Sequence, residues 1–262
     1  MIRRESALGS KPALTNPGQA EPKGFSFLRH ASPTLTAVLV DAGFFLKRAL
    51  HVYGHQPPEV IARNLHKLAL EHLNDDKGRR VSRLYRIFVY DAPPVAWKGH
   101  RPISKKAVDF GQSDAARWRL AFHEHLKCLR KVALRLGEIP TSQVSWQLKP
   151  EALKALAAGK QNWAAITDDA FHLNFRQKGV DMRIGLDIAS LAYKRQINQI
   201  VLVSGDSDFV PAAKLARREG IDFVLDPMWS TIRPNLYEHI DGLKSVCPRP
   251  GKTNAKPAGK AG

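Results

Sequence analysis

Cysteine is scarce in this sequence, and long hydrophobic runs are missing. The only cysteines are Cys128 and Cys247, which lie far apart in the chain; this excludes a disulfide framework and a cysteine-rich zinc site. No stretch reaches the roughly 18 to 20 apolar residues of a membrane-spanning helix. The first 24 residues also contain no hydrophobic segment of the kind found in signal peptides. We therefore expect a cytoplasmic protein without a membrane partner.

Several common catalytic motifs are also absent. No G-x-G-x-x-G motif opens a helix, and no P-loop motif occurs. A phosphatase with an aspartyl nucleophile needs a second Asp two residues after the first, but Gly43 follows Asp41 at that spacing. A nucleophile elbow needs glycine where Phe209 stands. The histidines are scattered, and His123 and His125 point different ways on one helix, so we expect them to be ordinary surface or groove residues.

Acidic residues are outnumbered by basic ones. The 41 Lys and Arg exceed the 24 Asp and Glu and give a net charge of +17. Residues 1–30 and 247–262 together contribute +7, so the rest of the chain carries +10. Such an excess favours a polyanionic partner, most simply nucleic acid, because clustered Lys and Arg displace counterions from phosphates. A solvated basic surface, ribosomal contact and membrane-surface contact stay open on charge alone.

The order of the predicted elements indicates an α/β fold. Residues 1–33 and 247–262 are rich in Pro, Gly and Lys and are expected to be disordered basic tails around a domain at 34–246. Strands are predicted at 36–41, 82–91, 199–203 and 221–225, with helices between them, which favours a parallel sheet covered on both faces. An inserted helical segment is expected at about 95–160. It includes a long basic helix over 114–136, with Asp114 as its N-cap and Gly137 as its C-cap.

Carboxylates follow two of the predicted strands. Asp41 ends one strand, and Asp206 and Asp208 follow another. Ligands of open α/β sheets bind beyond the carboxyl ends of the strands, so adjacent strands would bring these side chains together. Each like-charge pair at about 4 Å costs on the order of 4 kcal/mol at an effective dielectric of about 20, and a Mg²⁺ ion would offset this repulsion. Each Asp could instead be a helix N-cap.

The motifs "TAVLVDAGFFLKR", "FVYDAPP", "KGVD" and "VLVSGDSDF" together resemble the NYN domain, the bacterial branch of the PIN-like metal-dependent ribonucleases. The resemblance covers most of residues 35–241. It implies a PIN-like three-layer α/β/α fold with a central parallel sheet, and an acidic pocket that holds Mg²⁺ or Mn²⁺. The expected partner is RNA and the expected activity is hydrolysis of RNA phosphodiester bonds. Some members of the family are thought to act in regulation, so a non-catalytic RNA-binding module is the alternative.

The resemblance also assigns site residues. Asp41, Asp181, Asp206 and Asp208 match the family's catalytic, metal-binding acids. Asp187 is expected to be an outer-shell or second-metal residue. On one helix, it lies about 120° around the helix axis and about 9 Å along it from Asp181, so both acids are not expected to touch one ion. Family members often have asparagine near the position of Phe44, so this chain departs from the pattern there.

A second group of residues is expected to contact the RNA. Near the acids, the candidates are the hydroxyls of Ser204 and Ser207 and the cations of Lys178 and Arg183. In the inserted segment, Trp97, Lys98 and Arg101 combine an aromatic ring with positive charge, which suits a stacked and neutralised single strand. Ordinary solvated charges and a Trp97 packed in a core stay open as alternatives. The remainder of the insert could form a homodimer or partner surface.

Overall fold

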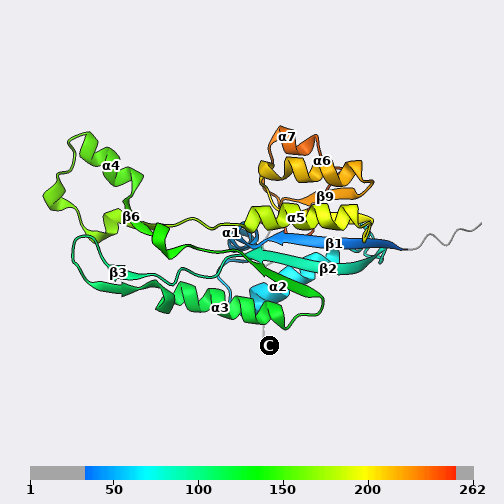
Figure 1. The fold of residues 1–262 in the computed structure, drawn as a ribbon, viewed down its shortest axis with the longest axis horizontal. Helices are drawn as coiled ribbons and strands as arrows, with labels where there is room; N and C mark the ends of the chain where they lie inside the picture. The colour runs from blue at the N-terminus through cyan, green and yellow to red at the C-terminus, as the bar shows by residue number, and fades with distance from the viewer. Residues whose placement is uncertain (1–32, 252–262) are drawn as a thin grey trace, which may run out of the picture. The chain divides into compact units, whose positions relative to one another are not determined.

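The computed structural model describes residues 33–251, and its centre is a six-stranded parallel sheet (Figure 1). The strands run in the order β10-β9-β8-β1-β2-β5. Their bounds are β1 Thr34–Asp41, β2 Ser82–Asp91, β5 Val132–Leu136, β8 Gln199–Val203, β9 Asp222–Asp226 and β10 Gly242–Leu243. All neighbouring pairs in this sheet are parallel.

The sheet forms because its central strands are apolar on both faces. In β1, Ala37 and Leu39 point to one face while Val38 and Val40 point to the other, and all four are fully buried. Parallel strands with two covered faces are typically such continuous runs of branched apolar residues. The predicted strands at 36–41, 82–91, 199–203 and 221–225 are thereby confirmed within about two residues at each end.

Helices cover both faces of the sheet (Figure 1). Helices α5 and α6 pack on the face that includes Leu39, and α1, α2 and α3 pack on the face that includes Val40. The helix bounds are α1 Ala42–Tyr53, α2 Pro58–Glu71, α3 Asp114–Lys127, α4 Pro150–Ala157, α5 Val180–Tyr193, α6 Val210–Arg218 and α7 Pro234–Tyr237. The expected three-layer α/β/α arrangement with a central parallel sheet is confirmed.

The order of the strands reverses between β1 and β8. From β1 the chain proceeds to β2 and β5 on one side, and later returns to β8, β9 and β10 on the other. Val40 pairs with Val203 across this boundary, so the two strands end at the same level. The crevice beyond such a switch point is where open α/β sheets bind ligands. Asp41 and the loop after β8 lie at this switch point.

The prediction of one helix over 114–136 is wrong. Helix α3 stops at Lys127, Lys131 adopts a left-handed backbone conformation with φ of 63°, and Val132–Leu136 pair with β2 as the edge strand β5. The open edge of β2 offers hydrogen bonds to these apolar residues, so tertiary pairing overrides their helical pattern. The N-cap of α3 is Ser113, whose hydroxyl accepts a 3.2 Å hydrogen bond from the Ala116 amide, and not Asp114.

The inserted segment contains strands as well as helices. Besides α3 and α4 it holds two antiparallel pairs, β3 Lys98–His100 with β4 Ala107–Asp109, and β6 Ser145–Leu148 with β7 Phe171–Asn174. The antiparallel pairing therefore extends beyond the expected limit at residue 160.

Most of the two expected tails, 1–32 and 252–262, lies outside the described residues. Cys247, by contrast, is buried in the core, and its carbonyl accepts a 2.8 Å hydrogen bond from the Trp229 indole. The packed part of the chain therefore continues at least to Cys247. Within residues 33–251, no helix is both long and apolar enough to cross a membrane.

Candidate metal site at the strand ends

Aspartates lie at the carboxyl ends of four adjacent strands. Asp226 ends β9, Asp41 ends β1 and Asp91 ends β2, while Asp206 and Asp208 follow β8 in the loop at the switch point. Because the strands are parallel and paired in order, these side chains share one edge of the sheet. The edge combines a high density of negative charge with the position where α/β folds bind ligands.

Two of the predicted site residues also cap helices. The Asp41 carboxylate accepts a 3.1 Å hydrogen bond from the Phe44 amide at the start of α1. The Asp206 carboxylate accepts a 3.0 Å bond from the Asp208 amide and caps the 3₁₀ turn Ser207–Phe209. Each of these bonds uses one carboxylate oxygen, so N-capping leaves the second oxygen for another contact.

Asp181 enters the same region from the start of α5. The residue before the helix, Gly179, has φ of 79°, a left-handed conformation that glycine adopts without steric cost. Asp181 then lies in the first turn of the helix, where the helix dipole favours a carboxylate. The "KGVD" motif therefore consists of a turn glycine followed by an acid at a helix start.

The predicted acids influence one another electrostatically. Burial raises the pKa of Asp41 to about 6, with smaller contributions from the charges of Asp181 and Asp91. Burial also raises the pKa of Asp181, and the charges of Asp206 and Asp208 raise it further. Asp181 thus links the acid at the end of β1 to the pair after β8, and the structure brings these four carboxylates into one electrostatic group.

The loop after β8 passes close to α1, and this explains why residue 205 is a glycine. A Cβ atom on Gly205 would lie 2.8 Å from the ring of Phe44, closer than real Cβ contacts allow. Phe44, the residue at which this chain departs from the family pattern, therefore packs over the loop that carries Asp206. Its apolar ring holds the loop in place and adds no ligand atom.

The candidate ligands are carboxylate oxygens, the donor type that hard divalent cations prefer. Within residues 33–251, Asp41, Asp181, Asp206 and Asp208 form no salt bridge with Lys, Arg or His. In the same range, no three His, Cys, Asp or Glu side chains lie close enough together to hold one ion. Mg²⁺ is commonly held by one or two carboxylates and keeps several waters, so oxygen donors spread around one crevice suit it.

Asp187 lies in a separate set of contacts. Its carboxylate accepts a 2.8 Å hydrogen bond from the Tyr90 hydroxyl and forms a 3.2 Å ion pair with the Arg135 guanidinium. Burial and this carboxylate together raise the pKa of Tyr90. With one oxygen engaged by both partners, Asp187 anchors α5 to β2 and β5.

The prediction that His123 is an ordinary surface or groove residue is wrong, and Asp91 was missed as a site residue. Asp91 is buried, and its carboxylate contacts His123 Nε2 at 2.8 Å and Arg119 at 2.8 and 3.0 Å. Buried carboxylates require such partners because desolvation of an unpaired charge is costly. The rule that selected Asp41, an acid at the end of a strand, applies equally to Asp91 in the sequence.

Asp226, which also ends a strand, was likewise missed as a site residue. It is fully buried, and His72 Nε2 lies 2.8 Å from its carboxylate. Its other oxygen accepts a 2.7 Å hydrogen bond from the Met228 amide. Burial and the charge of Asp226 together raise the pKa of Cys247 to about 11. The two histidine–aspartate pairs therefore lie at β2 and β9, on either side of the carboxylate group.

The candidate RNA-binding residues near the acids have different surroundings. Ser204 is buried, and its hydroxyl accepts a 3.3 Å hydrogen bond from the Asp206 amide, so it shapes the loop. The Ser207 hydroxyl accepts a 3.3 Å hydrogen bond from Arg233, a cation that no sequence motif singles out. Lys178 and Arg183 are exposed on either side of Asp181.

The other RNA-binding candidates lie in the first antiparallel pair of the insert. Trp97 packs against Phe110 and Trp146 at 6.1 Å between ring centroids, as the core-packing alternative expects. The Lys98 ammonium pairs with the Asp109 carboxylate at 3.1 Å across β3 and β4. Arg101 lies at the end of this pair, where its backbone amide donates to the Lys106 carbonyl. The structure therefore does not place these three residues among the strand-end acids.

Comparison with known families gives one match at this site. Residues 135–232 match the family model of the NYN domain. The resemblance to the NYN domain is therefore confirmed. The matched span contains Asp181, Asp206 and Asp208, whereas Asp41 lies outside it. NYN domains are generally ribonuclease-like hydrolases, and three of the four acids, Asp181, Asp206 and Asp208, lie in the matched span.

Two further comparisons accompany the NYN match. A search of curated proteins gives no match. Among solved structures, the chain is similar to a protein of unknown function from Vibrio parahaemolyticus, with 13% identity and a TM-score of 0.45. The similarity covers 84% of this chain and 96% of that one.

Proposed function

We propose that this NYN-domain chain is a metal-dependent endoribonuclease that hydrolyses RNA phosphodiester bonds. The observation that carries the proposal is the group of four carboxylates at the switch point, in which neighbouring charges help raise the pKa of Asp41 and of Asp181; the four form no ion pair within residues 33–251. A fold keeps such repulsion where a cation or a reaction uses it, which is why perturbed acids in a crevice indicate functional sites.

The cation would be Mg²⁺ or Mn²⁺, with one or two of Asp41, Asp181, Asp206 and Asp208 as direct ligands and waters in its other positions, because no three potential ligands within residues 33–251 are close enough to hold one ion. When bound, it supplies polarisation of a phosphoryl oxygen and a lower pKa for a coordinated water. Asp187 acts from outside this set, because Tyr90 and Arg135 already engage its carboxylate. The hydroxyl of Ser204 orients Asp206 through the backbone of the loop.

The cations around the group bind the RNA backbone. Lys178 and Arg183 flank Asp181, and Arg233 reaches Ser207 beside Asp208. Positive charges on the rim hold phosphates next to an acidic centre that would otherwise repel them. Lys98 and Arg101 in the insert would offer RNA a second basic region away from the acids, while Trp97 packs against Phe110 and Trp146.

One observation favours the alternative, a non-catalytic RNA-binding or regulatory module. Within residues 33–251, no three potential ligand side chains are close enough to hold one ion. A domain that only binds RNA would keep the basic surface and would not need three carboxylates on one cation. The two candidates therefore predict the same RNA affinity and different responses to metal.

The test is an RNA cleavage assay with the purified full-length chain. Single-stranded and structured RNA are incubated with Mg²⁺, with Mn²⁺ or with EDTA. We expect cleavage only with a divalent cation and a loss on the order of 100-fold or more in Asp206→Asn, because a ligand of the cation is lost. Asparagine still caps the 3₁₀ turn, so the fold is kept.

A matched control is Asp76→Asn, since the Asp76 side chain is 98% exposed and its one ion pair, with Lys244, is at the surface. This variant should cleave like the wild type. RNA that stays intact with wild type and either metal, while still binding, would replace the nuclease by the non-catalytic module.

A further inference from the structure

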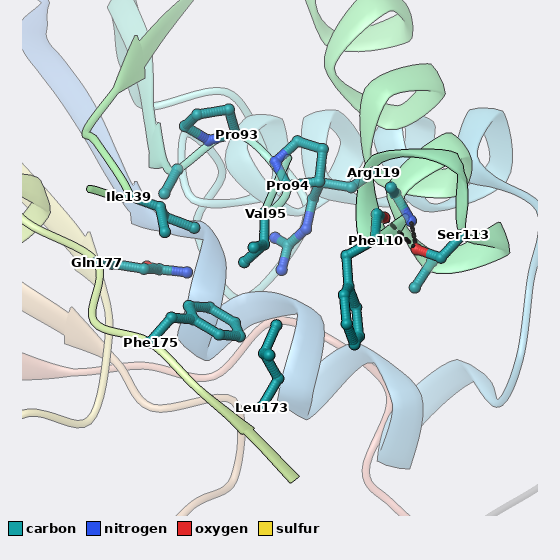
Figure 2. Close-up of a pocket in the computed structure, with 13 residues that line it drawn as sticks. Pro93, Pro94, Val95, Phe110, Ser113, Arg119, Ile139, Leu173, Phe175 and Gln177 are labelled. Carbon is teal, nitrogen blue, oxygen red and sulfur yellow. Dashed lines mark hydrogen bonds between the residues drawn. The ribbon is translucent and has the colours of Figure 1, made fainter. Parts of the chain in front are cut away.

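A pocket of about 230 Å³ lies beyond the carboxyl end of β2, next to the carboxylate group. Its walls come from the loop after Asp91, the start of α3 and the segment before α5. Figure 2 shows the side chains of Phe110, Leu173 and Phe175 directed into it, together with the guanidinium of Arg119. None of the site residues expected from the sequence lines this pocket.

The pocket is connected to the candidate metal site by its own lining residues. Arg119 points into the pocket and also holds the carboxylate of Asp91, whose charge acts on Asp41. On the opposite wall, Gln177 lies four residues before Asp181. The pocket and the carboxylate group therefore lie at the same edge of the sheet and are linked through Arg119 and Asp91.

The lining suits a flat, partly polar ring. The Phe110 ring is supported from behind by Trp97 and Trp146, at 6.1 and 5.8 Å between centroids. Phe175 is 38% exposed, so its ring is accessible to a group that enters the pocket. The volume is below the roughly 300 to 1,000 Å³ of pockets for drug-sized ligands, so it matches a single small ring system.

The polar groups at the pocket select a nucleobase over an apolar side chain of a protein. The Gln177 amide carries both donors and an acceptor, and no hydrogen-bond partner for it occurs within residues 33–251. Gln177 is flanked in sequence by the exposed cations Arg176 and Lys178. An unstacked base needs a ring to stack on, an amide for its edge and cations for the adjoining phosphates.

We propose that this pocket binds one unstacked base of single-stranded RNA, next to the phosphate that lies at the carboxylates. Phe175 stacks on the base, with Phe110 forming the opposite wall, and Gln177 reads its edge. This inference rests on the proposed function and makes it more specific. The RNA substrate is single-stranded at this position, and Gln177 sets the preference for one base.

The test is a binding experiment in the Asp206→Asn background, so that the RNA is not cut. A labelled single-stranded oligoribonucleotide is compared with a series in which one nucleotide at a time is abasic. We expect one position at which loss of the base weakens binding by roughly 5- to 100-fold, the usual contribution of one stacked base. Phe175→Ala should weaken binding of the intact oligonucleotide by a similar factor and remove the sensitivity at that position.

Two further variants isolate the role of each group. Trp163→Ala is the matched control, because Trp163 is an aromatic residue that is 68% exposed and does not line the pocket; it should leave the abasic profile unchanged. Gln177→Leu keeps the size of the side chain and removes the amide. It should change the preference among the four bases at the sensitive position without affecting the abasic oligonucleotide.

The outcomes separate this inference from the function on which it rests. If RNA is bound or cleaved but Phe175→Ala shows the same abasic profile as its parent, the base pocket is wrong and the nuclease stands. A loss of affinity that is the same at every abasic position would also overturn the base pocket. If the wild type neither binds nor cleaves RNA, the proposed function itself fails.

Discussion

Two kinds of carboxylate lie at the same edge of the sheet. Asp91 and Asp226 are almost completely buried, and each is paired with a histidine at 2.8 Å. Asp41 and Asp181 are more accessible and have no cationic partner within residues 33–251. The first kind has its charge neutralised by the protein itself. The second kind is arranged so that its charge stays available to something outside the chain.

The difference shows how one edge of a sheet can hold both neutralised and unpaired carboxylates. A fully buried unpaired charge is too costly to keep, so the deep positions receive Arg119, His123 and His72. Asp41 is only partly buried, so the fold tolerates it without a cationic partner, and burial raises its pKa. Each kind predicts a different response when a carboxylate is removed or neutralised.

Removal of a paired carboxylate should have the largest effect on stability. In Asp91→Ala, Arg119 and His123 lose their partner in a buried site, so we expect a loss of about 3 to 5 kcal/mol in the free energy of unfolding. Urea denaturation measures this loss. Asp208→Ala, from the unpaired group, is the comparison and should cost less than about 1 kcal/mol. Equal losses of unfolding free energy in Asp91→Ala and Asp208→Ala would show that the paired and unpaired carboxylates do not differ in their contribution to stability.

The pH dependence of stability sharpens the comparison at Asp41. Its pKa is about 6 in the folded chain, above the ordinary value of 3.8. The folded state therefore binds the proton more tightly, and stability should fall as pH rises from about 4 to 6, by at most about 3 kcal/mol. Thermal unfolding in EDTA at several pH values measures this fall.

The matched variant for the pH series is Asp41→Asn, which removes the charge and still caps α1. It should lose this part of the pH dependence and melt higher than the wild type at pH 7 in EDTA. A pH profile identical to that of the wild type would show that Asp41 is not the group responsible.

Addition of a divalent cation should give the smallest of the three effects. At 100 times its dissociation constant, a cation that binds only the folded state stabilises it by roughly 2.7 kcal/mol. For a domain of this size the melting temperature should rise by roughly 5 to 11 °C. Asp41→Asn should lose most of this rise, whereas Asp91→Asn should keep it, because Asp91 is already engaged by Arg119 and His123. A rise of the same size in Asp41→Asn would exclude Asp41 as a ligand.

The sequence by itself determined the layer arrangement and the position of the acids along it. Runs such as "TAVLV" and "QIVLV" are apolar on both faces, so they must lie inside a covered parallel sheet. In such a sheet, Asp41, Asp206 and Asp208 necessarily reach the carboxyl edge. The placement of Asp181 beside them depended on the NYN resemblance, because nothing in the spacing alone brings the start of α5 to that edge.

The tertiary structure decided which carboxylates have partners and where the chain departs from its local pattern. Arg119 and His123 lie on α3, 28 and 32 residues after Asp91, and local sequence carries no signal for contacts at that range. Residues 132–136 follow a helix-compatible pattern, yet they form β5, because β2 has an open edge that only exists once the sheet has assembled. The base pocket has the same origin. Its walls come from segments that lie far apart in the sequence and that only packing against the end of β2 brings together.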